Sequence, residues 1–385
     1  MTYYPTVIDL FCGCGGFSTG LLDAGMKVVS GFDIDRRAIE VYNYNHQYRG
    51  AKGFQKDLSQ LSGKDILSLS NLDSVDMIVG GVPCQAFSIV GKREGINDPR
   101  GKLIFDFIRL LDELRPAAFI LENVPNLKKV SKGEIFELLI SEFQNLGYIV
   151  KYDVLSAADY GVAQNRKRIF IVGVRGCEIK KFPPSATHCE PDSLLVRLNN
   201  ISPYVTCRDV LENLPDVDMP QAELFWNHEP TIHNETVLQE LQVLRPGTRS
   251  KKYFYDRLHP DRLSYTLRAG SGNFTPLRPI HYKYNRVISV RESARLQGFS
   301  DDFIWEDSIP RLQQYRQVGN AVCPPVAKAL GILICETVGW ERNPEIFKGN
   351  LSSRATPLKK PRSVKQKERA ALIRGASMGS PAKVS

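Results

Sequence analysis

Short apolar runs alternate with amphipathic stretches along the first 175 residues of the chain. Apolar runs bounded by Gly, Pro, Asn or Asp are typical of buried strands, and apolar residues spaced by three and four are typical of helices. This alternation predicts an α/β fold in which helices cross over between the strands of a doubly wound, mostly parallel sheet. Seven strands are expected, at residues 6–11, 28–32, 53–55, 75–79, 117–121, 149–155 and 168–174.

Two of the amphipathic stretches show the helical spacing clearly. The first, GKLIFDFIRLLDELRP, has its apolar face at Leu103, Phe107, Leu110, Leu111 and Leu114. The second, GEIFELLISEFQNLG, has its apolar face at Ile135, Leu138, Leu139 and Leu146, with Gly147 as its stop signal. Both faces are expected to pack on the sheet.

A polar or reactive feature follows each of the first five predicted strands. The first strand leads into a glycine-rich turn, the second into Asp33 and Asp35, and the third into Asp57. The fourth leads into GGVPCQAFS, which contains Cys84, and the fifth into Glu122. Because the carboxyl ends of parallel strands open onto the same edge of a sheet, these features are expected to converge on one ligand site.

The glycine turn DLFCGCGG lies between a strand and a helix predicted at 17–24, where glycines let the backbone approach a ligand. Its spacing is not the G-x-G-x-x-G of dinucleotide sites. Asp33 stands where a carboxylate would bind a ribose, and Asp57 would accept from an adenine amine. These features favour an adenosine cofactor without phosphates. The alternative is a metal or redox site at Cys12 and Cys14, but Cys-x-Cys does not by itself complete a tetrahedral site.

Composition and charge place bounds on the class of protein. The chain has 385 residues, 42% of them hydrophobic and 24% charged, which is ordinary for a globular protein of more than one domain. Scattered cysteines, no secretion signal and no long apolar stretch predict a cytoplasmic protein without a membrane partner. The formal charge is +9, but nine Lys or Arg against one Glu lie from residue 349 onward, so the folded body is close to neutral.

Several short motifs occur together along the chain in a fixed order. VPCQAFS follows the glycine turn, then come ENV at 122–124 and QNRKR at 164–168, and finally RESARLQGF at 291–299 and QVGNAV at 317–322. With these motifs the chain resembles the C5-cytosine DNA methyltransferases, of the bacterial restriction–modification type, over most of its length. Departures are few: Ala163 stands where many relatives have proline, and Cys12 where alanine is common.

The resemblance implies a class I, Rossmann-like methyltransferase fold that binds S-adenosylmethionine and no metal. Phe11 would then lie against the adenine, Asp33 would hold the ribose, and Asp57 would meet the adenine amine. The last motif would return to close the pocket. The cofactor-binding residues implied in this way are Phe11, Gly13, Gly15, Gly16, Asp33, Ile34, Asp57, Leu58, Pro83, Asn320 and Ala321.

The resemblance also assigns the catalytic groups. Cys84 would add as a thiolate to carbon 6 of cytosine, because carbon 5 is otherwise too weak a nucleophile to accept a methyl group. Glu122 would assist at nitrogen 3, which requires a raised pKa, while Arg166 and Arg168 would orient the base and Glu122. The target base would be flipped out of the duplex.

The strand–helix rhythm breaks down from about residue 192, where basic and aromatic residues mix with turn formers. We therefore expect a catalytic domain at 1–190 completed by 318–345, a smaller β-rich target-recognition domain at 191–285, a hinge with the penultimate motif at 286–317, and a basic, disordered tail at 346–385. Double-stranded DNA is the expected partner, a restriction endonuclease would act separately, and the protein would be a monomer. The expected DNA contacts are Gln85, Ser88, Arg100, Lys251, Lys252, Arg257, Thr266 and Arg268.

Two other functions remain open at this stage. A transfer-RNA cytosine-5 methyltransferase would share the catalytic core, but the long basic and aromatic middle region and the missing Cys-Phe-Thr signature argue against it. A regulatory DNA-binding protein with vestigial activity is disfavoured by the intact Cys84, Glu122 and Arg168.

Overall fold

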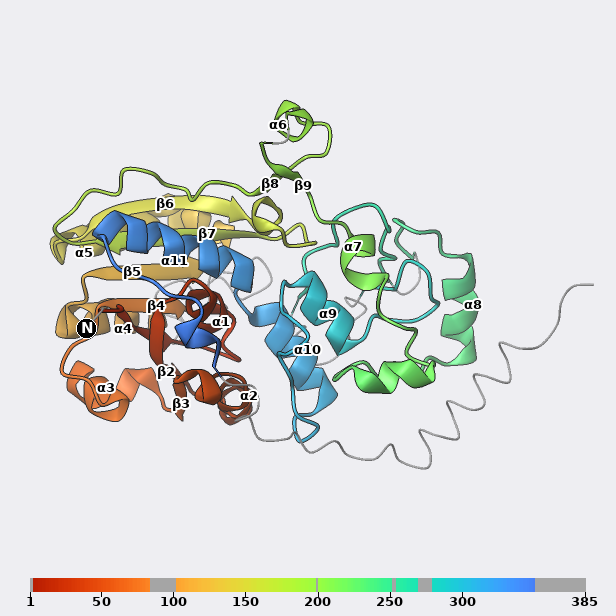
Figure 1. Ribbon diagram of the computed structural model, residues 1–385, viewed down its shortest axis with the longest axis horizontal. Helices are drawn as coiled ribbons and strands as arrows, with labels where there is room; N and C mark the ends of the chain where they lie inside the picture. Colours follow the sequence, from red (N-terminus) through yellow and green to blue (C-terminus); the bar gives the residue numbers. More distant parts are fainter. Residues whose placement is uncertain (1–2, 84–101, 199, 251–253, 269–278, 350–385) are drawn as a thin grey trace, which may run out of the picture.

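The computed structural model describes residues 3–83, 102–198, 200–250, 254–268 and 279–349. A seven-stranded sheet occupies one side of the molecule, and a smaller, mainly helical domain the other (Figure 1). The order of the strands in the sheet is β3-β2-β1-β4-β5-β7-β6. The strands are β1 (Thr6–Leu10), β2 (Lys27–Asp33), β3 (Lys52–Gln55), β4 (Met77–Gly81), β5 (Ala118–Asn123), β6 (Ile149–Ser156) and β7 (Lys167–Val174).

The sheet confirms the predicted doubly wound, mostly parallel arrangement. β1 to β5 pair in parallel, and only β7 runs antiparallel to both of its neighbours, β5 and β6. Each predicted strand is present with its ends moved by at most two residues. The apolar runs are continuous because the central strands are covered on both faces: β5 has no exposed residue.

Two helical layers cover the sheet. On one face α1 (Gly16–Asp23), α2 (Arg36–His46) and α11 (Pro324–Val338) pack on the alternate strand residues that include Val7 and Val79. On the other face α3 (Gly63–Ser70), α4 (Leu103–Leu114) and α5 (Glu134–Asn145) pack on those that include Ile8 and Leu121. α1 and α11 are close enough that a Cβ at Gly20 would lie 2.2 Å from the carbonyl oxygen of Pro324. The last long helix among the described residues thus completes the domain that the first strand begins.

The smaller domain differs from the β-rich prediction. Within 191–285 the described residues form α7 (Cys207–Leu211) and α8 (Glu235–Val243), joined by long irregular segments. The helices α9 (Val290–Leu296) and α10 (Arg311–Asn320) follow, in the predicted hinge and at its end. The only strands described between 175 and 349 are the two-residue β8 (His188–Cys189) and β9 (Ser202–Pro203), which carry α6 (Leu194–Arg197) out from the body (Figure 1). Short 3₁₀ helices complete the secondary structure: η1 (Gln47–Arg49), η2 (Leu58–Gln60), η5 (Pro125–Gly133), η6 (Ala157–Tyr160), η7 (Pro220–Leu224) and η8 (Ile346–Lys348).

Three further expectations need correction. The fold does not stop at residue 345, because Phe347 is buried and its carbonyl accepts a 2.7 Å hydrogen bond from Arg49. Leu138 of α5 is exposed, so it does not belong to the buried face of that helix. The stretch Arg311–Val338 is long and apolar enough to cross a membrane by composition alone, but most of it is buried inside the protein. Its apolar character is therefore that of core helices.

Candidate active site

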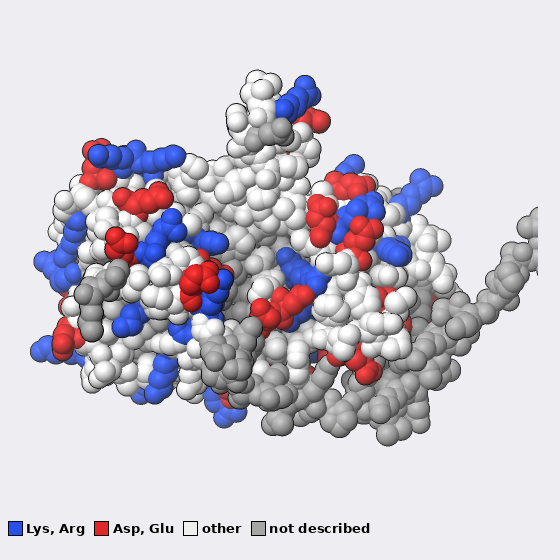
Figure 2. Space-filling model, viewed as in Figure 1, with Lys and Arg blue, Asp and Glu red and all other residues white. Residues whose placement is uncertain are grey.

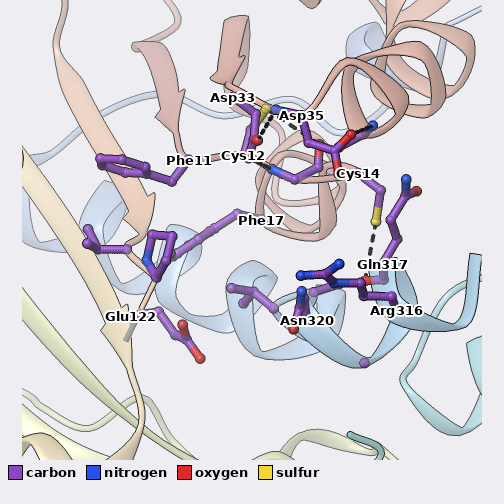
Figure 3. A pocket seen from close by; sticks show the side chains of 18 of the residues that line it. Phe11, Cys12, Cys14, Phe17, Asp33, Asp35, Glu122, Arg316, Gln317 and Asn320 are labelled. Carbon is purple, nitrogen blue, oxygen red and sulfur yellow. Dashed lines mark hydrogen bonds between the residues drawn. The ribbon is translucent and has the colours of Figure 1, made fainter. Parts of the chain in front are cut away.

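A cavity of about 330 Å³ opens where the strands β1, β2, β4 and β5 end, and α10 closes its other side (Figure 3). This volume lies within the roughly 300–1,000 Å³ of small-molecule sites. Of the residues predicted to bind a cofactor, Phe11, Gly13, Asp33, Pro83, Asn320 and Ala321 line the cavity, together with the predicted catalytic Glu122, Arg166 and Arg168. Three of the five predicted features, namely the glycine turn, the acids after the second strand and Glu122, therefore converge on one edge of the sheet, whereas Asp57 does not line the cavity.

The glycine turn is held by a carboxylate of the next strand. Phe11 and Gly13 both have left-handed backbone conformations, with φ of 57° and 54°. The amide of Gly13 donates to Asp33 Oδ2 at 2.9 Å, and the amide of Asp35 donates to Asp33 Oδ1 at 2.8 Å. Burial raises the pKa of Asp33, although these two hydrogen bonds oppose the rise. Asp33 thus shapes the turn as well as lining the cavity.

Gly15 and Gly16 serve close packing instead of lining the cavity. A Cβ at Gly15 would lie 2.3 Å from the His46 ring, and one at Gly16 would lie 2.3 Å from the carbonyl oxygen of Val322. The second contact is backbone and cannot yield. Gly16 therefore lets the start of α1 meet the last motif of the chain.

Cys12 and Cys14 act as protonated, buried side chains. The thiol of Cys12 donates to the carbonyl of Gly13, and that of Cys14 to the carbonyl of Gln317. Burial raises the pKa of Cys14 to about 12. Among the described residues, no group of three His, Cys, Asp or Glu side chains could hold a metal ion.

Asp9 is a buried acid that the sequence reasoning missed. Its Oδ2 accepts from the Ser18 hydroxyl at 2.6 Å and from the Ser18 amide at 3.2 Å, whereas its Oδ1 is buried without a described partner. Burial raises the pKa of Asp9 to about 7. The signal in the sequence was an aspartate inside an otherwise apolar strand, which costs free energy unless a partner compensates it.

Glu122 and Arg168 form an ion pair in the wall of the cavity. Glu122 lies within β5 opposite Gly81 of β4, and Arg168 lies on the neighbouring β7. Arg168 Nε is 3.0 Å from Glu122 Oε1. Burial raises the pKa of Glu122, and the positive charges of Arg168 and Arg166 oppose this rise. The pair can therefore hold a proton or a negative charge, depending on what binds beside it.

Arg166 joins distant parts of the chain. Its guanidinium is buried and donates to the carbonyls of Leu267 at 3.3 Å and Ala321 at 3.2 Å. Burial lowers the pKa of Arg166 to about 10, and the charge of Arg168 acts in the same direction. The side chain of Gln297 donates to the same carbonyl of Ala321 at 2.7 Å. Arg166 thus positions the last motif against the cavity.

Several predicted residues lie away from the cavity or outside the described residues. Ile34 is exposed, Leu58 is buried in the core, and Asp57 accepts from the amide and hydroxyl of Ser59 at the start of η2. None of the three lines the cavity. The predictions for Cys84, Gln85, Ser88, Arg100, Lys251 and Lys252 lie outside the described residues.

The predicted DNA contact at Arg257 is wrong. Arg257 is buried, and its guanidinium donates to the carbonyls of Leu241, Leu244 and His281 and to the side chain of Asn285. All three nitrogens of its guanidinium thus donate within the smaller domain. Thr266 is half-buried, and its hydroxyl donates a hydrogen bond to the carbonyl of Asn165. Arg268 is exposed. On the face in Figure 2 positive and negative side chains are interspersed over both domains, in keeping with a nearly neutral body.

The fold and the cavity together define a class of protein. A doubly wound sheet with a glycine turn after its first strand and an acid at the end of its second is the framework of enzymes that bind an adenosine-containing cofactor. The model of the C-5 cytosine-specific DNA methylase family matches residues 5–335, and the chain belongs to this family. It is an enzyme that methylates carbon 5 of cytosine in DNA, with S-adenosylmethionine as the methyl donor.

Individual relatives agree with the family. The chain is 33% identical over 342 residues to the type II methyltransferase M1.HphI of Haemophilus parahaemolyticus, covering 84% of this chain and 85% of that protein. It is 31% identical over 359 residues to M.XorII of Xanthomonas oryzae pv. oryzae, covering 85% and 84%. A crystal structure of a prophage-encoded Escherichia coli protein, assigned as a DNA modification methyltransferase, matches with a TM-score of 0.71 at 27% identity, covering 87% and 99%. Dnmt2 of Schizosaccharomyces pombe matches at 21% identity with a TM-score of 0.64, which shows a shared fold.

The residues of the cavity fit S-adenosylmethionine, which carries a sulfonium, an ammonium and a carboxylate group. The unpartnered Oδ1 of Asp9 is an acceptor that a cationic ligand would satisfy. Asp33 keeps its carboxylate at the cavity wall, and the half-buried ring of Phe11 offers an apolar surface for a purine.

Proposed function

We propose that the protein is a sequence-specific methyltransferase of duplex DNA, acting in a restriction–modification system and protecting the host DNA. The ion pair of Glu122 and Arg168 carries this proposal, since Glu122, an acid with a raised pKa, lines the same cavity as Pro83, the residue before Cys84 in the sequence. Its relatives at 31–33% identity are type II methyltransferases. The enzyme would act as a monomer in the cytoplasm, with a separate restriction endonuclease recognising the same sequence.

In this mechanism the thiolate of Cys84 forms a bond to carbon 6 of a flipped-out cytosine. The electron pair of the 5,6 double bond then moves toward carbon 5, and negative charge spreads to nitrogen 3 and the carbonyl oxygen. Carbon 5 would then take the methyl group, and the cofactor would leave as a neutral thioether. Loss of the carbon 5 proton would finally expel the thiolate and restore the ring. Cysteine suits this role because it is nucleophilic and leaves again readily.

Glu122 would relieve the charge at nitrogen 3 by donating its proton there. Because burial raises the pKa of Glu122, its protonated form persists closer to neutral pH than that of an ordinary glutamate. Arg168 fixes the direction of the carboxyl group through its 3.0 Å contact and stabilises the carboxylate once the proton has left. Arg166 acts as a positioning residue, because its described hydrogen bonds reach backbone carbonyls.

The cofactor supplies an electrophilic methyl group on a sulfonium. Phe11, Asp33 and Asn320 would hold it, with Asp9 accepting from its cationic part. The smaller domain, proposed to span 191–285, would select the DNA sequence, and the exposed Arg268 next to Thr266 is a candidate contact. The loop of residues 163–166 ties the domains together, since the amide of Ser264 donates to the carbonyl of Ala163 at 3.0 Å and the amide of Asn165 to the carbonyl of Ser264 at 2.8 Å.

Covalent trapping tests the proposal directly. The protein is incubated with S-adenosylmethionine and duplex DNA carrying 5-fluorocytosine at its methylation site, because fluorine cannot leave as a proton would. A stable adduct that peptide mapping places on Cys84 is expected. Cys84→Ser should abolish the adduct, whereas Cys177→Ser, which changes a half-buried cysteine outside the cavity lining, should leave it intact.

Parallel reactions with duplex DNA and transfer RNA decide between the substrates. Methyl transfer to DNA alone is expected. Transfer to RNA alone, or an adduct on a residue other than Cys84, would overturn the proposal. Target-specific DNA binding without any methyl transfer would instead support the regulatory protein.

A further inference from the structure

α10 presents one row of polar side chains to the cavity. Gln313, Arg316, Gln317 and Asn320 all line it, at the spacing that places residues on one face of a helix. Figure 3 shows Arg316 beside Asn320, projecting from α10 across the cavity from Phe11. None of the predicted site residues lies on this row except Asn320.

Arg316 is the cation of the cavity that the protein itself does not use. Arg168 pairs with Glu122, and Arg166 donates to two backbone carbonyls. Arg316 is exposed, and it makes no hydrogen bond or salt bridge with any residue in the described ranges. The N–H donors of an arginine that faces a cavity without such partners are available to bind an anion.

Three acids of the cavity, Asp9 in β1, Asp33 at the end of β2 and Asp35 at the start of α2, come from other elements, and Figure 3 shows Asp33 and Asp35 away from Arg316. The fourth acid, Glu122, is paired with Arg168. A ligand with separated charges would turn its positive part toward these acids and its negative part toward α10. The methyl donor of this family is such a ligand, since its methionine part ends in an ammonium and a carboxylate.

We propose that Arg316 binds the carboxylate of the methionine part of S-adenosylmethionine and so sets the orientation of the cofactor. The proposal rests on that cofactor occupying this cavity. A guanidinium pairs with a carboxylate through two parallel hydrogen bonds, which adds direction to the attraction. Asn320, one turn further along the same face, would contact the same part of the ligand. Hydrogen bonds to charged groups are the stronger ones, and because Arg316 is exposed we expect the lower end of their range, about tenfold in affinity.

Decarboxylated S-adenosylmethionine, which lacks the carboxylate but keeps the sulfonium and the amine, isolates this contact. Dissociation constants of both ligands are measured by calorimetry on the full chain without DNA. The wild type should bind S-adenosylmethionine about tenfold more tightly than the decarboxylated ligand. Arg316→Gln should lose this preference by weakening only the complete cofactor, and Arg316→Lys should restore part of it.

Lys328→Gln removes an exposed positive charge from α11, outside the cavity lining, and should change neither constant. Thermal unfolding of each variant verifies that it is folded. Equal weakening of both ligands by Arg316→Gln, or no weakening of either, would overturn the proposal. So would unchanged cofactor binding with a lower salt dependence of DNA binding, which would assign Arg316 to a DNA phosphate. The dissociation constants of the two ligands do not depend on formation of the Cys84 adduct. A failure of the proposed catalytic function can therefore be told apart from a failure of the proposal for Arg316.

Discussion

Replacing Arg257 by methionine tests whether this residue stabilises the smaller domain or contacts DNA. Arg257 Nη1 lies 2.8 Å from the carbonyl oxygens of both Leu241 and Leu244, at the end of α8, and Nε lies 3.1 Å from that of His281. Methionine would fill similar space but donate nothing. A buried acceptor left without a partner costs about 1–3 kcal/mol. The carbonyls of Leu244 and His281 would each lose this donor, whereas that of Leu241 keeps the amide of Leu244, so the free energy of unfolding should fall by about 2–6 kcal/mol.

Thermal unfolding and DNA binding separate the two roles. At roughly 2–4 °C per kcal/mol, the unfolding temperature of Arg257→Met should fall by at least about 4 °C. The matched control is Arg268→Met, which changes an exposed arginine of the same domain and should leave the unfolding temperature unchanged. If Arg268 contacts a phosphate, that variant should reduce the slope of DNA affinity against salt by about 1. An Arg257→Met protein with wild-type unfolding and a reduced salt slope would refute the structural role.

Three more changes probe the cavity. Asp9 has a pKa of about 7 in the folded protein and of 3.8 in the unfolded chain, so between these values only the folded protein holds the proton. The stability of the wild type should therefore fall as the pH rises from about 4 to about 7, and denaturant titrations of Asp9→Asn should lack this fall. The same pKa predicts that wild-type affinity for the cationic cofactor falls below pH 7, and calorimetry of Asp9→Asn should show weaker binding without that pH dependence. Gly16→Ala should cost about 1–3 kcal/mol in denaturant unfolding, because its Cβ would lie 2.3 Å from a backbone oxygen, and an unchanged stability would contradict the packing argument. Arg168→Met removes the positive charge that opposes the raised pKa of Glu122, so the pH profile of kcat should move to higher pH; an unmoved profile would exclude Glu122 as the titrating group.

The sheet could be predicted from the sequence because burial on both faces gives apolar runs with clear ends. The strands at β1 and β5 and the helix Leu103–Leu114 illustrate this, since the predicted and observed ranges differ by two residues at most. Convergence of Asp33 and Glu122 on one cavity followed from the parallel topology. Such predictions need only local patterns and the direction of the strands.

The smaller domain could not be predicted in the same way, because its contacts join residues far apart in sequence. Nothing local shows that the donors of Arg257 reach carbonyls from residue 241 to residue 281. Two local signals for helices were nevertheless present. Thr206 with Asp209 and Ser289 with Glu292 form capping boxes at the starts of α7 and α9, and this spacing is typical of helix starts.

The row on α10 escaped prediction for another reason. Arg316 lies in a largely polar helix. The buried residues of this helix include the polar Gln314 as well as Val318, so the apolar period in its sequence is weak. Only the structure shows that Arg316 faces a cavity. For Asp9, likewise, the sequence shows an acid in a strand but not that one of its oxygens lacks a described partner.

The packing of α11 on α1 has a consequence for how the protein is made. β7 ends at Val174, but the helix that covers the same layer of the sheet ends only at Val338. At roughly 5–20 residues per second, the ribosome needs on the order of 10–30 s to synthesise the intervening chain. During that interval the part of the sheet face that α11 covers is open to solvent, and the cavity lacks the wall that α10 supplies. A ribosome that stalls within the smaller domain would therefore leave a product unable to bind its methyl donor, and a natural client for chaperones.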